Sequence, residues 1–108
     1  IRSQKGDDSM EKKKEVRIYV AGDCVDILNH NILTISGVGG STIIPANGYW
    51  LDDDANLIEE DSYIIVVIVD ESLINKVLSK IPLVVDDQEC VLVTIEDVDT
   101  ILIKLKKS

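Results

Sequence analysis

Apolar and polar residues alternate near the start of the chain, as they do in a β-strand that is covered on one face. Val16, Ile18 and Val20 are each separated by one other residue, so their side chains share one side of an extended segment. The pattern predicts a strand over residues 16–21, and Gly22 follows it as a break.

A short helix is expected after this strand. Asp23 is a residue type whose side chain accepts hydrogen bonds from the first turn of a helix, and apolar residues at helical spacing extend to Ile35. The next residues, Ser36-Gly37-Val38-Gly39-Gly40, contain too much glycine to continue a helix and predict a flexible loop.

Two strands joined by a polar turn are predicted over residues 41–69. The first, 41–51, contains Pro45, which lacks a backbone N–H group and therefore confines this strand to a sheet edge or a bulge. Residues 52–56 are good turn formers. The second strand ends in an apolar run at 63–69. Because this run is apolar on both faces, we expect it to be a central, covered strand.

The last third of the chain predicts one helix and two strands. Apolar residues recur at helical spacing over 70–81, and Pro82 is expected to stop that helix because proline cannot continue one. Alternating patterns then predict strands over 89–96 and 98–105, with Asp97 as the break between them.

The predicted order, β-α-β-β-α-β with an extra C-terminal strand, is that of an α+β ferredoxin-like sandwich, in which helices cover one face of an antiparallel sheet. A single helix layer leaves the other face open, so we expect further copies of the chain to cover it in a homo-oligomer, a dimer or trimer. One such domain is expected over residues 10–108. Residues 1–9 are interpreted as a tag remnant or a disordered tail, because Met10 opens a stretch typical of a natural protein start.

Composition narrows the function classes. Of the 108 residues, 20 are acidic and 11 are basic, which gives a formal net charge of −9. Such a chain repels phosphate at long range, so nucleic-acid binding through a basic face is not expected. The basic residues crowd both ends, and none lies between Arg17 and Lys76, where acidic residues accumulate. If the two ends belong to neighbouring strands, their lysines are expected to splay into solvent.

The cysteines and the apolar runs point to a cytoplasmic protein without membrane contact. No run approaches the roughly 18 apolar residues that a membrane helix needs, and the first residues lack the apolar centre of a signal peptide. Cys24 and Cys90 match no metal-binding or redox spacing. We expect both to be reduced and buried.

Four short motifs occur in order along the chain: Gly40-Ser41-Thr42, Gly48-Tyr49-Trp50, Glu60-Asp61-Ser62 and, at 88–94, Gln-Glu-Cys-Val-Leu-Val-Thr. Together they resemble a group of small, mostly uncharacterised bacterial and phage proteins with a ferredoxin-like fold. The resemblance covers about residues 16–103 and implies the fold, but it carries no activity. Trimeric nucleotide-sensing PII-like proteins are a fold analogy. The basic residues that their nucleotide sites use on loops and hairpin are missing here.

Two groups of residues are candidates for binding a small ligand. The backbone amides around Gly39 and Gly40, with the hydroxyl of Thr42, can cradle an anion. No lysine follows the glycines as in stronger phosphate loops, and a plain helix-to-strand connection is the alternative. Tyr49 and Trp50 form the second group. They are adjacent in a predicted strand, so their side chains point to opposite faces, and paired aromatic residues beside an acidic turn are typical of a contact site.

Acidic residues of the same hairpin are the candidate contacts for a basic protein partner. Asp52, Asp53 and Asp54 belong to the turn, and Glu60 lies near the start of the second strand. The turn imitates the start of a calcium loop but lacks the glycine at position six and the glutamate at position twelve, so no metal site is predicted. With His30 as the single histidine and no nucleophile motif, no catalytic residue and no cofactor are assigned.

We therefore expect a non-enzymatic binding module, homo-oligomeric, with a basic protein or a small ligand as its partner. The phage character of the resemblance narrows this expectation to a phage-encoded protein that acts on a host defence protein or on a signalling nucleotide. Two alternatives from other classes are a small ferredoxin-like enzyme with an active site between subunits and a structural subunit of a larger assembly.

Overall fold

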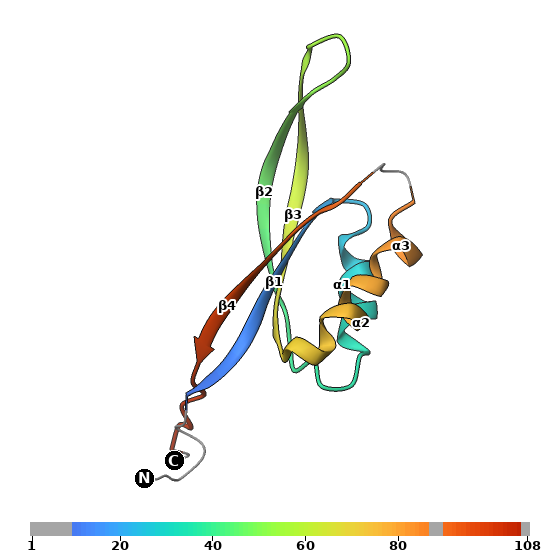
Figure 1. Cartoon of the computed structure of the whole chain (residues 1–108). Coiled ribbons are helices and arrows are strands. Elements are labelled where there is room, and N and C mark those ends of the chain that lie inside the picture. The colour runs from blue at the N-terminus through green and yellow to red at the C-terminus, as the bar shows by residue number, and fades with distance from the viewer. Residues whose placement is uncertain (1–9, 87–89, 107–108) are drawn as a thin grey trace.

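The computed structural model describes residues 10–86 and 90–106, and its elements form a helix layer on one face of a sheet (Figure 1). The predicted tail at residues 1–9 lies outside the described residues. The strands are β1 (Glu11–Ala21), β2 (Thr42–Leu51), β3 (Leu57–Val69) and β4 (Leu92–Thr100). The helices are α1 (Val25–Leu33), α2 (Ile74–Ser79) and α3 (Ile81–Val84), with a 3₁₀ turn, η2 (Glu71–Leu73), before α2.

The four strands form one antiparallel sheet in the order β2-β3-β1-β4. With the helices on one face, this arrangement confirms the predicted ferredoxin-like α+β fold. β2 lies at a sheet edge, as Pro45 predicted. The start of β1 lies beside the end of β4, with Glu11 opposite Thr100, so residues from the two ends of the sequence are neighbours.

The core lies between the sheet and the helix layer. Val16 lies opposite Val67, and Ile18 opposite Ile65. These four side chains are 0–1% exposed, because alternate residues of each strand face the helices. Leu28 of α1 is fully buried among them. The apolar alternation in the sequence therefore marks the covered face correctly.

The opposite side of the sheet, which we call the open face, carries Ile64, Val66 and Ile68 of β3. These residues alternate with the buried ones, and Ile68 is 46% exposed. In the described parts of the chain no helix lies on this side (Figure 1). The prediction that β3 is central is confirmed, but a single chain covers only one of its two apolar faces.

The helical region after β3 is divided, where one helix over 70–81 was predicted. It begins as η2, continues as α2 and gives way to α3, whose first turn contains Pro82. The expectation that Pro82 ends the helix is wrong, because the first turn of a helix does not need the N–H group that proline lacks. None of the helices among the described residues is long and apolar enough to cross a bilayer.

β4 is one strand where two were predicted. It passes through Asp97 without a break, and residues 101–106 form no helix or strand, so the extra C-terminal strand is absent from the described residues. Asp97 is accommodated because Lys14 lies opposite it on β1 and bonds its carboxylate. The expectation that the lysines at the start of the chain splay into solvent is therefore wrong for Lys14.

Two local expectations around the cysteines need correction. Asp23 was expected to cap α1, but Cys24 occupies the capping position and no side chain caps the first turn of the helix. Cys24 is buried as expected, whereas Cys90 is exposed, because it precedes β4 at the uncovered sheet edge.

Candidate functional site

The glycine loop, residues 36–41, joins α1 to β2 and is anchored near both ends. Gly37 has a φ of 98°, a conformation that favours glycine, and a Cβ there would lie 2.9 Å from Leu73 Cδ1. At the other end, the hydroxyl of Ser41 donates a hydrogen bond of 2.5 Å to Asn29 Oδ1 on α1. Contacts with the helix layer therefore fix the two ends of the loop.

Gly39 and Gly40 lie between these anchors and are not required by packing. A Cβ added to either residue would meet nothing within 4 Å. Among the described glycines a positive φ occurs at Gly37 and not at these two positions. The space beside the two residues is open, so a ligand or a second chain can approach their backbone closely.

The glycine loop borders a hollow of about 810 Å³ on the open face, which we call the glycine hollow. Val66 and Ile68 of β3 supply apolar lining, Thr42 of β2 lies next to the loop, and Ile101 and Leu102 line it after the end of β4. A concave, mostly apolar space with a few polar groups is typical of a site for a small molecule.

The charged groups of the glycine hollow are more acidic than basic. Lys13 Nζ donates a hydrogen bond of 2.6 Å to Asp70 Oδ1 and lies 4.0 Å from Glu11 Oε1. The hydrogen bond to Asp70 is the main cause that raises the pKa of Lys13 above its ordinary value. Asp99 adds a further carboxylate to the lining. Because this ammonium is already engaged with carboxylates, a phosphate group is poorly matched to the hollow of a single chain.

The β2–β3 hairpin projects beyond the helix layer as an arm (Figure 1), and its aromatic side chains bond to acids. Tyr49 Oη donates to Glu59 Oε2 and Trp50 Nε1 donates to Glu60 Oε1, each at 3.0 Å. The side chains remain accessible, since Tyr49 is 58% and Trp50 is 50% exposed. Exposed aromatic rings beside carboxylates are suited to contact a cationic group.

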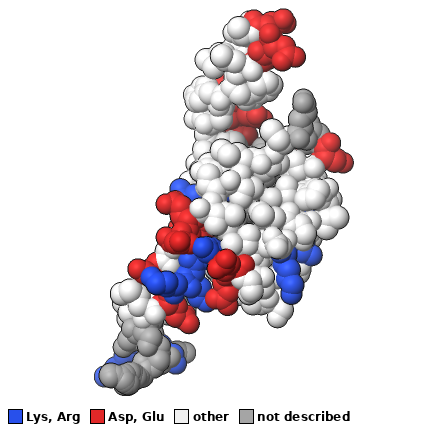
Figure 2. All heavy atoms as spheres, viewed as in Figure 1, with Lys and Arg blue, Asp and Glu red and all other residues white. Residues whose placement is uncertain are grey.

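The turn at the tip of the arm is organised by its own first aspartate. Asp52 Oδ1 accepts hydrogen bonds of 2.9 Å from the backbone N–H groups of Asn56 and Asp54. These bonds lower the pKa of Asp52 below its ordinary value, and the bond from Asn56 has the largest effect. Asp53 and Asp54 are exposed, at the acidic tip visible in Figure 2. Among the described residues, no group of His, Cys, Asp and Glu side chains has the arrangement of a metal site.

The structure separates the two groups of residues that the sequence proposed for ligand binding. Gly39, Gly40 and Thr42 lie at the start of β2, whereas Tyr49 and Trp50 lie near its end. Thr42 and Tyr49 are seven positions apart, or about 23 Å at the rise of a β-strand. Within one chain the first group lines the glycine hollow, and the second belongs to the arm.

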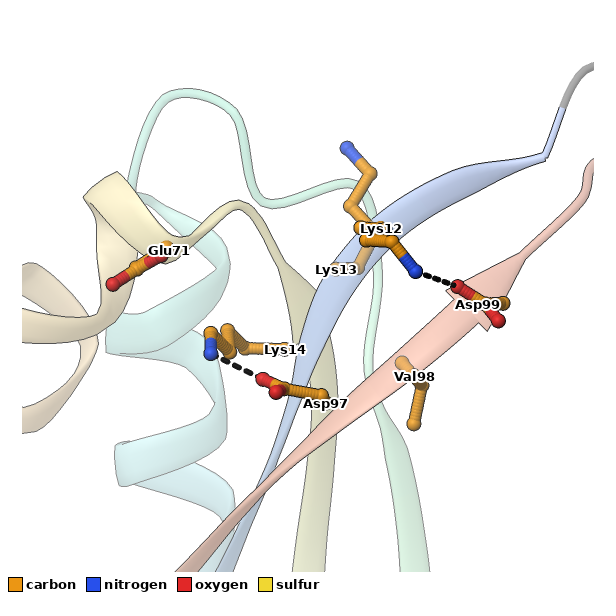
Figure 3. A pocket seen from close by; sticks show the side chains of 7 residues that line it. All are labelled: Lys12, Lys13, Lys14, Glu71, Asp97, Val98 and Asp99. Carbon is orange, nitrogen blue, oxygen red and sulfur yellow. Dashed lines mark hydrogen bonds and ion pairs between the residues drawn. The ribbon is translucent and has the colours of Figure 1, made fainter.

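Ion pairs where β1 meets β4 are a feature that the sequence interpretation missed (Figure 3). Lys12 Nζ lies 3.1 Å from Asp99 Oδ1, and Lys14 bonds Asp97. Each pair is directly opposite across the two strands. The signal was available, because lysines and aspartates spaced by two positions share one face of their strands. With Glu71 these residues line a hollow of about 380 Å³, but its lysines already contact carboxylates.

Comparison with known proteins identifies the fold. No protein-family model matches the chain, and no curated protein matches it. A PII-like nitrogen regulatory protein, CPII of Thiomonas intermedia, bound to ADP, AMP and bicarbonate, superposes with a TM-score of 0.66 at 19% identity, covering 85% of this chain and 96% of CPII.

Two further solved structures have the same architecture. The GlnK–ATP complex of B. subtilis has a TM-score of 0.67 at 14% identity, over 81% of this chain and 82% of GlnK. CutA1 from Oryza sativa has a TM-score of 0.67 at 11% identity, over 81% of this chain and 80% of CutA1. At these identities the likeness shows that the chain has the fold of PII-like proteins and CutA.

Proposed function

We propose that this protein is a non-enzymatic, homo-oligomeric binding module and that the glycine hollow is its ligand site. The observation that carries the proposal is the open space beside Gly39 and Gly40. Packing within the chain does not require glycine at these positions, because a Cβ there would contact nothing. The two residues also border a concavity of about 810 Å³. Close approach of a ligand to their backbone explains both facts.

The lining favours a ligand whose inserted part is uncharged. Val66 and Ile68 supply apolar surface, and Thr42 with the loop amides supplies hydrogen-bonding groups. Adenine nucleotides are the first class to test, because the CPII structure holds ADP and AMP and the GlnK structure holds ATP. The adenine would occupy the hollow, and the phosphates would lie outside it, within reach of a second copy.

The open face supports the homo-oligomer. Ile64, Val66 and Ile68 follow one another on that face of β3, and Ile44 of β2 lies opposite Ile64. Ile44 is 38% exposed and Ile68 is 46% exposed. Covering such contiguous apolar surface is favourable by about 25 cal/mol per Å² removed from water. A dimer or a trimer in which copies cover one another's open face meets this requirement.

Isothermal calorimetry with ADP and ATP on the full chain tests the ligand site. We expect Gly40→Val to weaken binding roughly tenfold or more, since about 1.4 kcal/mol corresponds to a factor of ten and the added side chain occupies the space of the ligand. The melting temperature is expected to stay unchanged, because nothing lies within 4 Å of a Cβ at Gly40. Leu83→Ala, at an exposed position on α3, is the matched control.

Two results would contradict the proposed ligand site. The proposal is wrong if neither nucleotide binds and mass spectrometry finds no small molecule released when the purified protein is denatured. Unaltered nucleotide affinity in Gly40→Val would place the ligand outside the glycine hollow.

The arm favours a second function, recognition of a basic protein. Its exposed aromatic side chains, Tyr49 and Trp50, lie beside Glu59 and Glu60, and acidic residues gather at its tip (Figure 2). In its specific form this proposal describes a phage-encoded protein that binds a host defence protein, or removes a signalling nucleotide through the glycine hollow. The acidic charge of the arm supports the protein partner.

Fluorescence of Trp50, the single tryptophan, reports contact with the arm. We expect a lysine- and arginine-rich peptide to change this emission and to bind more weakly as salt rises, because exposed charges are screened. Neutralising Asp53 and Asp54 together to Asn is expected to weaken binding, whereas Asp26→Asn on α1 is the control. Emission that stays constant to millimolar peptide rules out this second function.

A further inference from the structure

The segment that follows β4 exposes apolar side chains to an unusual extent. Leu102, Ile103 and Leu105 are 81%, 69% and 84% exposed. Residues 101–106 read Ile-Leu-Ile-Lys-Leu-Lys, a sequence typical of a strand, yet they form no strand in the single chain. We call this segment the C-terminal tail. Exposed apolar surface of this kind marks an interaction site.

β4 and the C-terminal tail carry opposite charge. Residues 91–100 contain three acidic residues and no basic one, whereas residues 101–107 contain three lysines and no acidic one. A strand built from both segments is acidic in its first half and basic in its second. Asp97 and Asp99 already pair with lysines of β1. Glu96 is therefore the carboxylate that an antiparallel second copy brings near the lysines of the tail.

The outer edge of β4 offers a place for the tail. β4 is the last strand of the sheet, with β1 on one side of it. Beside this edge lies an apolar groove of about 500 Å³, the edge groove, lined by Val93 and Ile95 of β4 and by Leu78, Ile81 and Pro82 of the helical region. No charged residue is among the described residues that line it.

The tail cannot fill the edge groove of its own chain. Ile101 lies six positions beyond Ile95, about 20 Å along an extended strand, and the tail would have to reverse direction at once. A tight reversal between adjacent strands requires left-handed backbone angles that Asn and Gly adopt. The residues at that point, Thr100 and Ile101, are β-branched and disfavour those angles.

We propose that the C-terminal tail extends β4 and pairs antiparallel with the outer edge of β4 in a second copy of the chain. This inference rests on the homo-oligomer of the proposed function and adds to it a contact between copies at the sheet edge. Because the two extended strands run antiparallel, each tail lies along the β4 edge of the other copy, and the contact is two-fold symmetric. The tail thereby becomes the strand that the sequence predicts after Asp97.

The pairing accounts for both kinds of tail residue. Side chains alternate along a strand, so Ile103 and Leu105 continue the face of Val93 and Ile95. They enter the partner's edge groove, while the lysines at even positions lie on the opposite face, which also carries Glu96 of β4. Apolar burial and charge pairing therefore act together along one edge.

Charge reversal tests this pairing with the full chain. Analytical ultracentrifugation of the double variant Lys104→Glu/Lys106→Glu is expected to show a dimer dissociation constant that is roughly tenfold higher, or more, than that of the wild type. The reason is that like charges then face each other. Adding Glu96→Lys to the double variant is expected to restore much of the affinity. Lys76→Glu/Lys80→Glu, two lysines of the helical region, is the control for altered net charge.

Hydrogen exchange gives a second measurement that does not depend on substitutions. Backbone amides of residues 101–106 are expected to exchange rapidly at nanomolar concentration and to become protected as the protein is concentrated. The amides of β2, at the other sheet edge, are expected to keep the same protection throughout.

The outcomes separate this inference from the proposed function. An oligomer that persists in the Lys104→Glu/Lys106→Glu variant, with an unprotected tail, overturns the tail pairing but leaves a homo-oligomer formed through the open face. A monomer up to about 100 μM, where weak specific contacts still form, overturns both. Nucleotide binding that survives dissociation would keep the ligand site within one chain.

Discussion

At the scale of single residues, the glycine loop shows two different reasons for glycine. Gly37 is favoured by the fold, because a φ of 98° strains a residue with a Cβ and that Cβ would lie 2.9 Å from Leu73 Cδ1. Gly39 and Gly40 meet no such limit. The sequence could not distinguish these positions, since a run of glycines predicts a loop without showing which residue is constrained.

Gly37→Ala is expected to lower the free energy of unfolding by about 1–2 kcal/mol, the cost of a left-handed conformation in a residue with a Cβ. Urea denaturation measures it as a lower midpoint at unchanged slope. The control Gly39→Ala is expected to stay within about 0.5 kcal/mol of the wild type. Equal loss in both variants would contradict the distinct roles of the two glycines.

At the scale of elements, the periodic segments were predictable and their limits were not. The strands β1, β2 and β3 follow from alternation and from Pro45, and α1 follows from apolar spacing. The continuity of β4 through Asp97 was hidden, because it depends on Lys14, which lies 83 positions away in the sequence. The position of Pro82 inside a first turn likewise depends on where neighbouring helices pack.

The contact between β1 and β4 is expected to depend on pH through Asp97. The hydrogen bond and charge of Lys14 hold the pKa of Asp97 below its ordinary value of 3.8. A carboxyl group with a lowered pKa in the folded state stabilises the fold above pH 3.8, and this contribution disappears as the pH falls through the lower, folded-state pKa.

Thermal denaturation of the wild type and of Asp97→Asn, at pH values from about 7 to about 2.5, tests this dependence. The range begins well above the ordinary pKa of an aspartate and ends about one unit below it. The wild type is expected to melt higher at neutral pH, and the difference is expected to vanish at the acidic end. High salt is expected to reduce it, because the pair is exposed. A difference that stays constant with pH would show that the substitution acts through packing and not through charge.

At the scale of the whole molecule, the sheet has one covered and one open face. Sequence alone predicted this asymmetry, because one helix layer cannot cover the doubly apolar β3. It could not place the candidate site, since the glycine loop, the tail and β3 come together only when the sheet is assembled. The distance between Thr42 and Tyr49 could have been predicted, because the strand expected over residues 41–51 already placed them seven positions apart.

The two faces of β3 are expected to respond differently to truncation. Ile65→Ala removes a fully buried side chain and is expected to cost about 2–5 kcal/mol at any protein concentration. Ile68→Ala is expected to cost little in dilute protein and more in concentrated protein, because only an oligomer buries that side chain. Melting curves over a hundredfold concentration range, as mass action requires, measure both.

The pairing of β1 with β4 also has a consequence for the order in which the chain folds. The hairpin of β2 and β3 joins neighbouring segments and can form early, whereas Glu11 and Thr100 are 89 positions apart. Contacts of long sequence separation form late. During synthesis β1 therefore keeps an unpaired edge until β4 has emerged from the ribosome. A chain that terminates before Leu92 would leave this edge permanently available for aggregation.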